Sequence, residues 1–202
     1  DVNLDTSDLT DTSYMFALSS RLREIPSLKT EKVTTARSMF SGCTSLAKLP
    51  SKKFDELVDG TEFCKECNQL TGVDNISFTS LTTAPYMFAG CRVASFDNLT
   101  FGNLDESPNM FYQCYGATLN NTTFGKIKNG NYMFYDCTNM KTLPRMDIRN
   151  ITNASYMFTN TRNMRGEFKQ SFNCLIEPQS PGSSNLAYRY SFQNMLDSSG
   201  LD

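Results

Sequence analysis

Cysteine is the most reactive side chain in this 202-residue sequence, which holds seven cysteines and no histidine. Cys64 and Cys67 have the C-x-x-C spacing found in zinc sites and redox-active thiol pairs. A zinc site needs further ligands, and the chain offers neither a second C-x-x-C pair nor a histidine. The lack of histidine also removes Ser-His-Asp and Cys-His catalysis. We therefore expect no metal, no cofactor and no enzymatic activity, with an enzyme of unrecognised site as the open alternative.

The spacing of the other cysteines indicates a repeat. Each repeat unit is anchored by one residue, which we call position 0, and the steps between these anchors are 23 or 24 residues: Phe16, Phe40, Cys64, Phe88, Phe111, Phe134 and Phe158. Five cysteines share position +3: Cys43, Cys67, Cys91, Cys114 and Cys137. A fixed period in this range is the signature of a solenoid. The ladder of cysteines is accordingly expected to be buried, with each thiol serving as a small apolar core residue.

Other positions of the unit recur in step. Position −1 is methionine in six of the seven units, position −7 is aliphatic and position −4 is small. Positions −4, −1, 0 and +3 lie on one face of a helical turn, so this segment predicts a short helix. The sequence that follows, Leu-x-x-Leu-Pro at 22–26 and 46–50, predicts a very short strand ended by proline. We therefore predict an α/β solenoid of about seven units, each with one short parallel strand and one short helical segment.

The repeat also sets the expected domain boundaries. Residues 1–175 form the predicted solenoid, and residues 176–202 form a divergent C-terminal cap that begins near Pro178, Pro181 and Gly182. The sequence starts inside a unit, so we expect an upstream domain or a neighbouring subunit to cover the N-terminal end.

Residues 39–50, Met-Phe-Ser-Gly-Cys-Thr-Ser-Leu-Ala-Lys-Leu-Pro, resemble the BspA-like leucine-rich repeats, as do residues 87–91 and 133–140. The resemblance covers about residues 4–175. It implies a leucine-rich-repeat fold and adhesion or ligand recognition, either at a bacterial cell surface or outside the cell. Such repeats also occur in phage structural proteins, which makes a virion surface the alternative location.

Two surfaces are candidates for binding, because solenoids recognise partners through side chains that project from adjacent repeats. The favoured one is the predicted strand face, with Arg23, Lys48, Lys141 and Arg165. The other carries aromatic residues that follow the predicted helical segment, namely Tyr112, Tyr115 and Tyr135. A partial tyrosine stripe also occurs at position −2: Tyr14, Tyr86, Tyr132 and Tyr156.

Charge and hydropathy narrow the choice of partner. The formal net charge is −2, and although residues 126–170 carry eight Lys or Arg against three acids, no nucleic-acid motif accompanies them. No apolar run is long enough to span a membrane. We expect non-enzymatic recognition of a protein or glycan on a host or target cell. The alternative is a phage or virion component that uses the repeats as a rigid docking surface or spacer.

Overall fold

The computed structural model describes residues 6–25, 27–49, 54–73, 76–92, 94–165 and 199. These residues contain five strands: β1 (Ser77–Phe78), β2 (Thr100–Phe101), β3 (Leu104–Glu106), β4 (Thr123–Asn129) and β5 (Arg145–Asp147). All pairings are parallel, in the order β1-β2-β4-β3 with β5 also paired to β4. A parallel sheet was predicted, and it is confirmed. The predicted cap at 176–202, Cys174 and the prolines at 26 and 50 lie outside the described residues.

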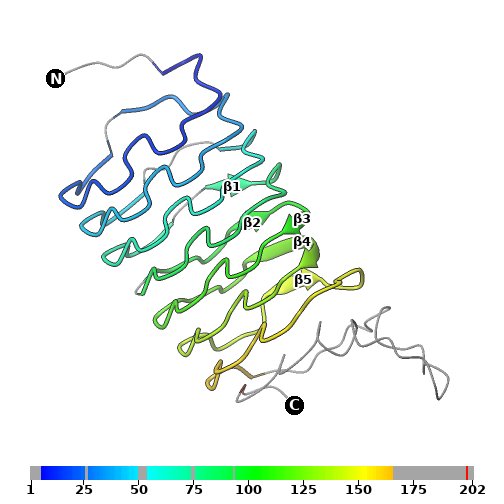
Figure 1. Cartoon of the computed structure of the whole chain (residues 1–202). Helices are drawn as coiled ribbons and strands as arrows, with labels where there is room; N and C mark the ends of the chain where they lie inside the picture. Colours follow the sequence, from blue (N-terminus) through cyan, green and yellow to red (C-terminus); the bar gives the residue numbers. More distant parts are fainter. Residues whose placement is uncertain are drawn as a thin grey trace, which may run out of the picture.

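Successive repeat units lie side by side, as Figure 1 shows for the turns of chain running from blue to yellow. Phe78 pairs with Phe101, and Phe101 with Phe124, so the register equals one repeat. Isolated parallel bridges extend the same register in two rows. The first row is at position −5, where Asp11 pairs with Thr35 and Thr35 with Asp59; the second follows the predicted strand segment and includes Lys48↔Gly72 and Thr142↔Arg165. Equivalent residues of neighbouring units are thereby brought next to one another.

The prediction of a short helix at positions −4 to +3 is wrong for the described residues. They form consecutive turns in this segment and no helix. The Met15 amide bonds to the Thr12 carbonyl at 3.2 Å, which closes a turn within the unit. The Phe16 amide instead bonds to the Met39 carbonyl of the next unit at 2.9 Å. In an α-helix that amide would bond four residues back in its own segment. Backbone amides in this segment therefore bond alternately within the unit and to the next unit. This pattern places the apolar residues on one side, as a helix would, but it is not a helix.

Residues with positive φ make these turns possible. They stand at positions −2 and +2, as at Tyr14 and Leu18, both with φ of 60°. A turn closed by an i to i+3 bond with positive φ at its third residue has the geometry of a type II turn. Glycine meets this need without strain at Gly42, where φ is 73°.

The position of the sheet also differs from the prediction. The segment expected to form the strands, just after position +6, contributes only isolated bridges within the described residues. The named strands lie before position 0, and the longest of them is the seven-residue β4. In β4 the buried side chains are Phe124 and Ile127, three residues apart. That spacing departs from the two-residue period of a flat strand, so counting alternation does not reveal it.

Phenylalanine columns form the centre of the molecule. Phe111 stacks on Phe88 at 5.6 Å and on Phe134 at 5.5 Å between ring centroids, in the column of position 0. A second column runs through Phe101 and Phe124, which are 4.8 Å apart, and meets Phe111 edge-on. Buried aliphatic and methionine side chains complete this core. With the apolar positions inside, the remaining side chains of each unit are displayed in rows on the outside.

Candidate functional site

The second bridge row places the cationic residues predicted to bind a ligand. The Ala47 amide reaches the Arg23 carbonyl at 3.5 Å, and the Arg165 amide bonds to the Lys141 carbonyl at 3.0 Å. Arg23, Lys48, Lys141 and Arg165 are all exposed. They lie in two groups at opposite ends of the row, because the units between them carry neutral residues such as Ser95 and Thr118. The structure therefore places the four residues along one row, in two pairs that lie apart from each other.

A cavity of about 750 Å³ opens at the N-terminal pair. Its lining combines apolar side chains with charged ones: Arg23, Glu24, Ile25, Ser45, Ala47, Lys48 and Leu49. Arg23 and Lys48 make no ion pair with any residue that the structure describes. A concave, partly apolar site with a few charged groups is the usual form of a ligand pocket. The two cations are thus available to an anionic group of a ligand, beside Ile25 and Leu49.

The C-terminal pair is organised differently. The Arg165 guanidinium donates from Nη1 to the carbonyl oxygens of Arg162 and Met164, at 3.0 and 2.8 Å. Its charge is therefore held against the backbone of its own unit. The side chain of Lys141, the other member of this pair, forms no ion pair with the described residues. At this end of the row, Lys141 is the cation that a ligand could engage without competing with bonds to Arg162 and Met164.

The second predicted surface becomes a compact group of rings. Tyr112 stacks on Tyr135 at 5.2 Å, as the sequence grouping suggests. Tyr132 and Tyr156 join them, 4.6 Å apart, although the sequence placed them in a separate stripe. Tyr115 is 40% exposed and makes no ring contact with the described residues, so it lies outside the group. The signal for the extra members was the three-residue spacing of positions −2 and +1 within one unit, which brings the rings of Tyr132 and Tyr135 to 5.4 Å.

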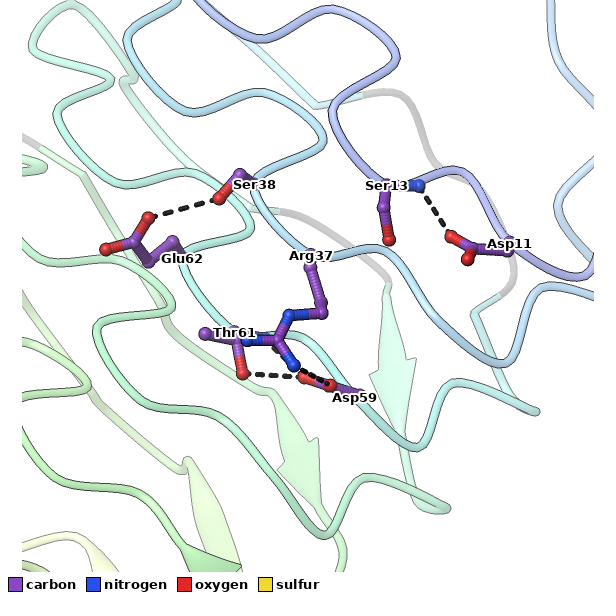
Figure 2. A network of polar contacts seen from close by, with 7 residues as sticks. All are labelled: Asp11, Ser13, Arg37, Ser38, Asp59, Thr61 and Glu62. Atoms are coloured by element: carbon purple, nitrogen blue, oxygen red, sulfur yellow. Dashed lines mark hydrogen bonds and ion pairs between the residues drawn. The ribbon is translucent and has the colours of Figure 1, made fainter.

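Polar side chains at position −5 hold the turns, as Figure 2 shows. Asp59 accepts hydrogen bonds from the backbone amide of Thr61 at 2.9 Å and from its hydroxyl at 2.6 Å. Asp11 accepts from the Ser13 amide at 2.8 Å in the equivalent turn. Arg37 reaches Asp59 at 3.4 Å. A carboxylate that accepts the amide two residues ahead stabilises a turn, so we assign this network a structural role that the sequence analysis missed.

A neighbouring ion pair belongs to the same network. Lys65 donates to Glu62 at 2.6 Å and, together with the Ser38 hydroxyl at 3.1 Å, holds the pKa of the Glu62 carboxyl below its usual value despite partial burial. Among the residues described, no three carboxylate, thiol or imidazole groups gather in a way that could hold a metal ion. Within this network the carboxylates of Asp59 and Glu62 are engaged by hydrogen bonds from neighbouring residues.

The cysteine ladder is buried, and none of its thiols is in a disulfide. Each ladder sulfur lies 3.1 Å from a carbonyl oxygen of the preceding unit, as Cys67 Sγ does from Phe40 and Cys137 Sγ from Phe111. The thiol donates to a carbonyl that would otherwise keep one free lone pair in the core. Burial raises the pKa of the Cys43 thiol to about 11, and it raises the pKa values of four further thiols: Cys64, Cys91, Cys114 and Cys137.

These thiols should therefore be unreactive in the native protein. Because all six described cysteines are buried, iodoacetamide at pH 8 is expected to label none of them. The raised pKa of five of these thiols further depletes the thiolate, which is the nucleophile. A Cys174→Ser variant removes the one cysteine outside the described residues. Intact-mass spectrometry should show no label before unfolding and six labels after it in guanidinium. Labelling of any ladder cysteine in the folded variant would contradict its burial.

Comparison with known proteins gives one match. A family model described as "Mycoplasma protein of unknown function, DUF285" matches residues 2–126 and, in a second alignment, residues 61–172. The chain matches none of the curated proteins and none of the solved structures. No helical stretch in the described residues has the length and hydropathy that crossing a membrane requires.

Proposed function

The chain belongs to the family described as "Mycoplasma protein of unknown function, DUF285", and from this premise we propose that it is a non-enzymatic recognition module built as a leucine-rich-repeat solenoid of the BspA-like type. The two overlapping alignments, offset by more than one unit, support a repeating chain. Inter-unit bonds such as Gly130 N to Asn153 O at 2.8 Å support the stacked arrangement. The repeats would act as a rigid frame that displays rows of side chains to a partner.

The cavity beside Arg23 and Lys48 is the observation that carries the proposal. It combines two cations that form no ion pair with the described residues and the apolar side chains of Ile25 and Leu49, so it suits a ligand that has an acidic group next to an apolar one. A protein or a glycan exposed on a host or target cell can present such a group. We accordingly propose that the protein works at the bacterial surface or outside the cell, where this partner is accessible.

Charge reversal at the cavity tests the proposal. The double variant Arg23→Glu with Lys48→Glu places two carboxylates beside Glu24, so an acidic ligand should be repelled. We expect binding of the labelled protein to fall at least about tenfold on an array of glycans and extracellular proteins, since losing a charge-assisted hydrogen bond costs about 1.5–3 kcal/mol.

The matched control reverses the other pair of the same row, Lys141→Glu with Arg165→Glu. Both double variants change the net charge equally, so a general electrostatic effect would lower binding in both. The proposal requires the cavity variant to lose binding and the control to keep it. Equal binding by the cavity variant and the wild type, or no bound partner on the array for the wild type, would overturn it.

A further inference from the structure

The four stacked tyrosines form a second surface with its own chemistry. We call Tyr112, Tyr132, Tyr135 and Tyr156 the tyrosine cluster. Two of its contacts are face-to-face stacks between neighbouring units, with interplanar angles of 13° for Tyr112–Tyr135 and 11° for Tyr132–Tyr156. The two stacks meet at angles of 53° and 65°. Inter-unit backbone bonds fix them, including Tyr132 N to Ser155 O at 2.9 Å and Gln113 N to Tyr135 O at 2.8 Å.

This stacking decides which groups of a ligand can be accommodated. In each pair the rings cover one face of each other, so a flat ligand finds a free ring face only at the ends of a stack. A sugar ring or a nucleobase that needs a series of open aromatic faces is therefore disfavoured. The rings are half-buried, and their flanks offer the ring edges and the phenol hydroxyls to solvent. Because the stacked rings are already ordered, binding there costs little side-chain entropy.

Among the described residues, the hydroxyls of the cluster are hydrogen-bond donors that no other side chain or carbonyl engages. None of the four makes a hydrogen bond to another residue in the described part of the chain, and burial raises the pKa of the Tyr112 and Tyr132 phenols, which keeps them protonated. The nearby Asp136 carboxylate already accepts a hydrogen bond from Asn160 at 2.9 Å. The surface thus presents several hydroxyls at fixed spacing, each of which can donate a hydrogen bond to a carbonyl of a ligand.

A proline-rich segment in the extended polyproline II conformation matches that pattern. Its backbone carbonyls have no internal partner, and proline has no backbone N–H that would need an acceptor. Three residues of this helix rise about 9.3 Å, and two steps between hydrogen-bonded units measure about 9.6 Å, so ligand carbonyls would recur in step with the three units from Tyr112 to Tyr156. Docking of proline-rich segments on aromatic side chains is an established recognition mode.

We propose that the tyrosine cluster binds an extended proline-rich protein segment, with the ring edges contacting the prolines and the hydroxyls donating to its carbonyls. This inference rests on the proposed recognition function, because it names the class of partner for one displayed row. It uses a surface other than the cavity, so the two proposals can fail separately.

A synthetic peptide of ten prolines is the probe, titrated into the full chain by isothermal calorimetry. The variant with Phe at positions 112, 132, 135 and 156 (Tyr112→Phe, Tyr132→Phe, Tyr135→Phe, Tyr156→Phe) keeps the stacked rings and removes only the hydroxyls. We expect it to bind at least about tenfold more weakly than the wild type, because several hydrogen bonds are lost. The control, Tyr14→Phe with Tyr86→Phe, changes two tyrosines outside the cluster and should bind as the wild type does.

Three results would overturn the inference: no binding of the peptide by the wild type, equal binding by the quadruple variant, or stronger binding of a neutral hexasaccharide than of the peptide at this cluster. If the quadruple variant does not fold, the single variant Tyr132→Phe replaces it, with an expected loss of about threefold. The cavity variant Arg23→Glu with Lys48→Glu should retain full peptide affinity. If this variant lost binding on the array but kept its affinity for the peptide, the result would bear on the cavity proposal and not on the tyrosine cluster.

Discussion

Replacing Phe111 with alanine is expected to lower the free energy of unfolding by about 3–5 kcal/mol, the usual cost of removing a fully buried phenylalanine side chain. Phe111 is completely buried and contacts aromatic rings of its own unit and of both neighbouring units: Phe88, Phe96, Phe101, Phe124 and Phe134. The resulting cavity would interrupt the column of position 0 in the middle of the molecule and remove the edge-on contacts that Phe101 and Phe124 make with it. Urea denaturation followed by circular dichroism measures the change.

The same experiment should reveal a loss of cooperativity. Units that contact only their neighbours are stabilised by the interfaces between them, so weakening one interface can uncouple the two halves of the array. The control is Tyr115→Ala, a change four residues away at a side chain that is 40% exposed. It should shift stability by less than about 1 kcal/mol. A Phe111→Ala protein that unfolds like the wild type would show that position 0 does not face the core.

Replacing Gly102 with alanine should destabilise the protein by about 3 kcal/mol, although only one methyl group is added. A Cβ atom at this position would overlap the carbonyl oxygen of Thr79 and lie 3.1 Å from that of Leu81. Both obstacles are backbone atoms, and the amide of Gly102 itself bonds to the Phe78 carbonyl at 2.9 Å. The chain can make room only by separating β2 from the unit before it. Thermal unfolding of the variant measures the effect.

Gly60→Ala is the matched control for this substitution. A Cβ atom there would meet only the ends of flexible side chains, Met87 Cε at 3.1 Å and Leu81 Cδ1 at 3.2 Å. Gly60 stands at position −4, where other units carry alanine, as at Ala36 and Ala84. We expect its stability to change by less than about 1 kcal/mol. Equal tolerance of alanine at both glycines would contradict the close approach of the two backbones at Gly102.

The repeat made the core predictable from the sequence. Position 0, the methionine before it and the aliphatic residue at −7 are buried wherever the middle units are described, as at Phe88, Met87 and Leu81. The prediction of burial succeeds because a side chain at a given repeat position contacts the equivalent side chains of neighbouring units. This holds for any backbone conformation of the unit. Periodicity therefore reports which side chains are inside more directly than it reports the backbone conformation.

The backbone was harder to predict because two structures share the same spacing. A helical turn and a pair of i to i+3 turns both bring positions −4, −1, 0 and +3 to one side. The distinguishing signal was at position +2, where glycine, asparagine and aspartate occur at Gly42, Asn160 and Asp136 and adopt positive φ. Leucine at the equivalent position of the first unit, Leu18, weakens that signal. The strands were also hard to predict, because the buried residues of β4 are three positions apart and do not alternate as in a flat strand.

The candidate site was predicted in part. The sequence identified Arg23 and Lys48 as exposed residues of one row, but the cavity between them depends on how Ile25 and Leu49 pack, which a repeat pattern does not specify. Nor does it specify that Arg165 bonds to carbonyls of its own unit. The tyrosine cluster arose from positions −2 and +1 of the repeat, whose rings meet within one unit at Tyr132 and Tyr135 and between units at the other contacts.

The cavity at Arg23 and Lys48 and the tyrosine cluster both depend on one claim. This claim is that the backbone amide at position 0 bonds to a carbonyl of the unit that follows. Scalar couplings across hydrogen bonds, measured by NMR on isotope-labelled protein, test this claim most directly. The predicted couplings join the amide of Phe88 to the carbonyl of Met110, that of Phe111 to Met133, and that of Phe134 to Met157, each across 2.9 Å. Couplings from these amides to carbonyls three or four residues earlier in the chain would contradict the stacked register and both proposed surfaces with it.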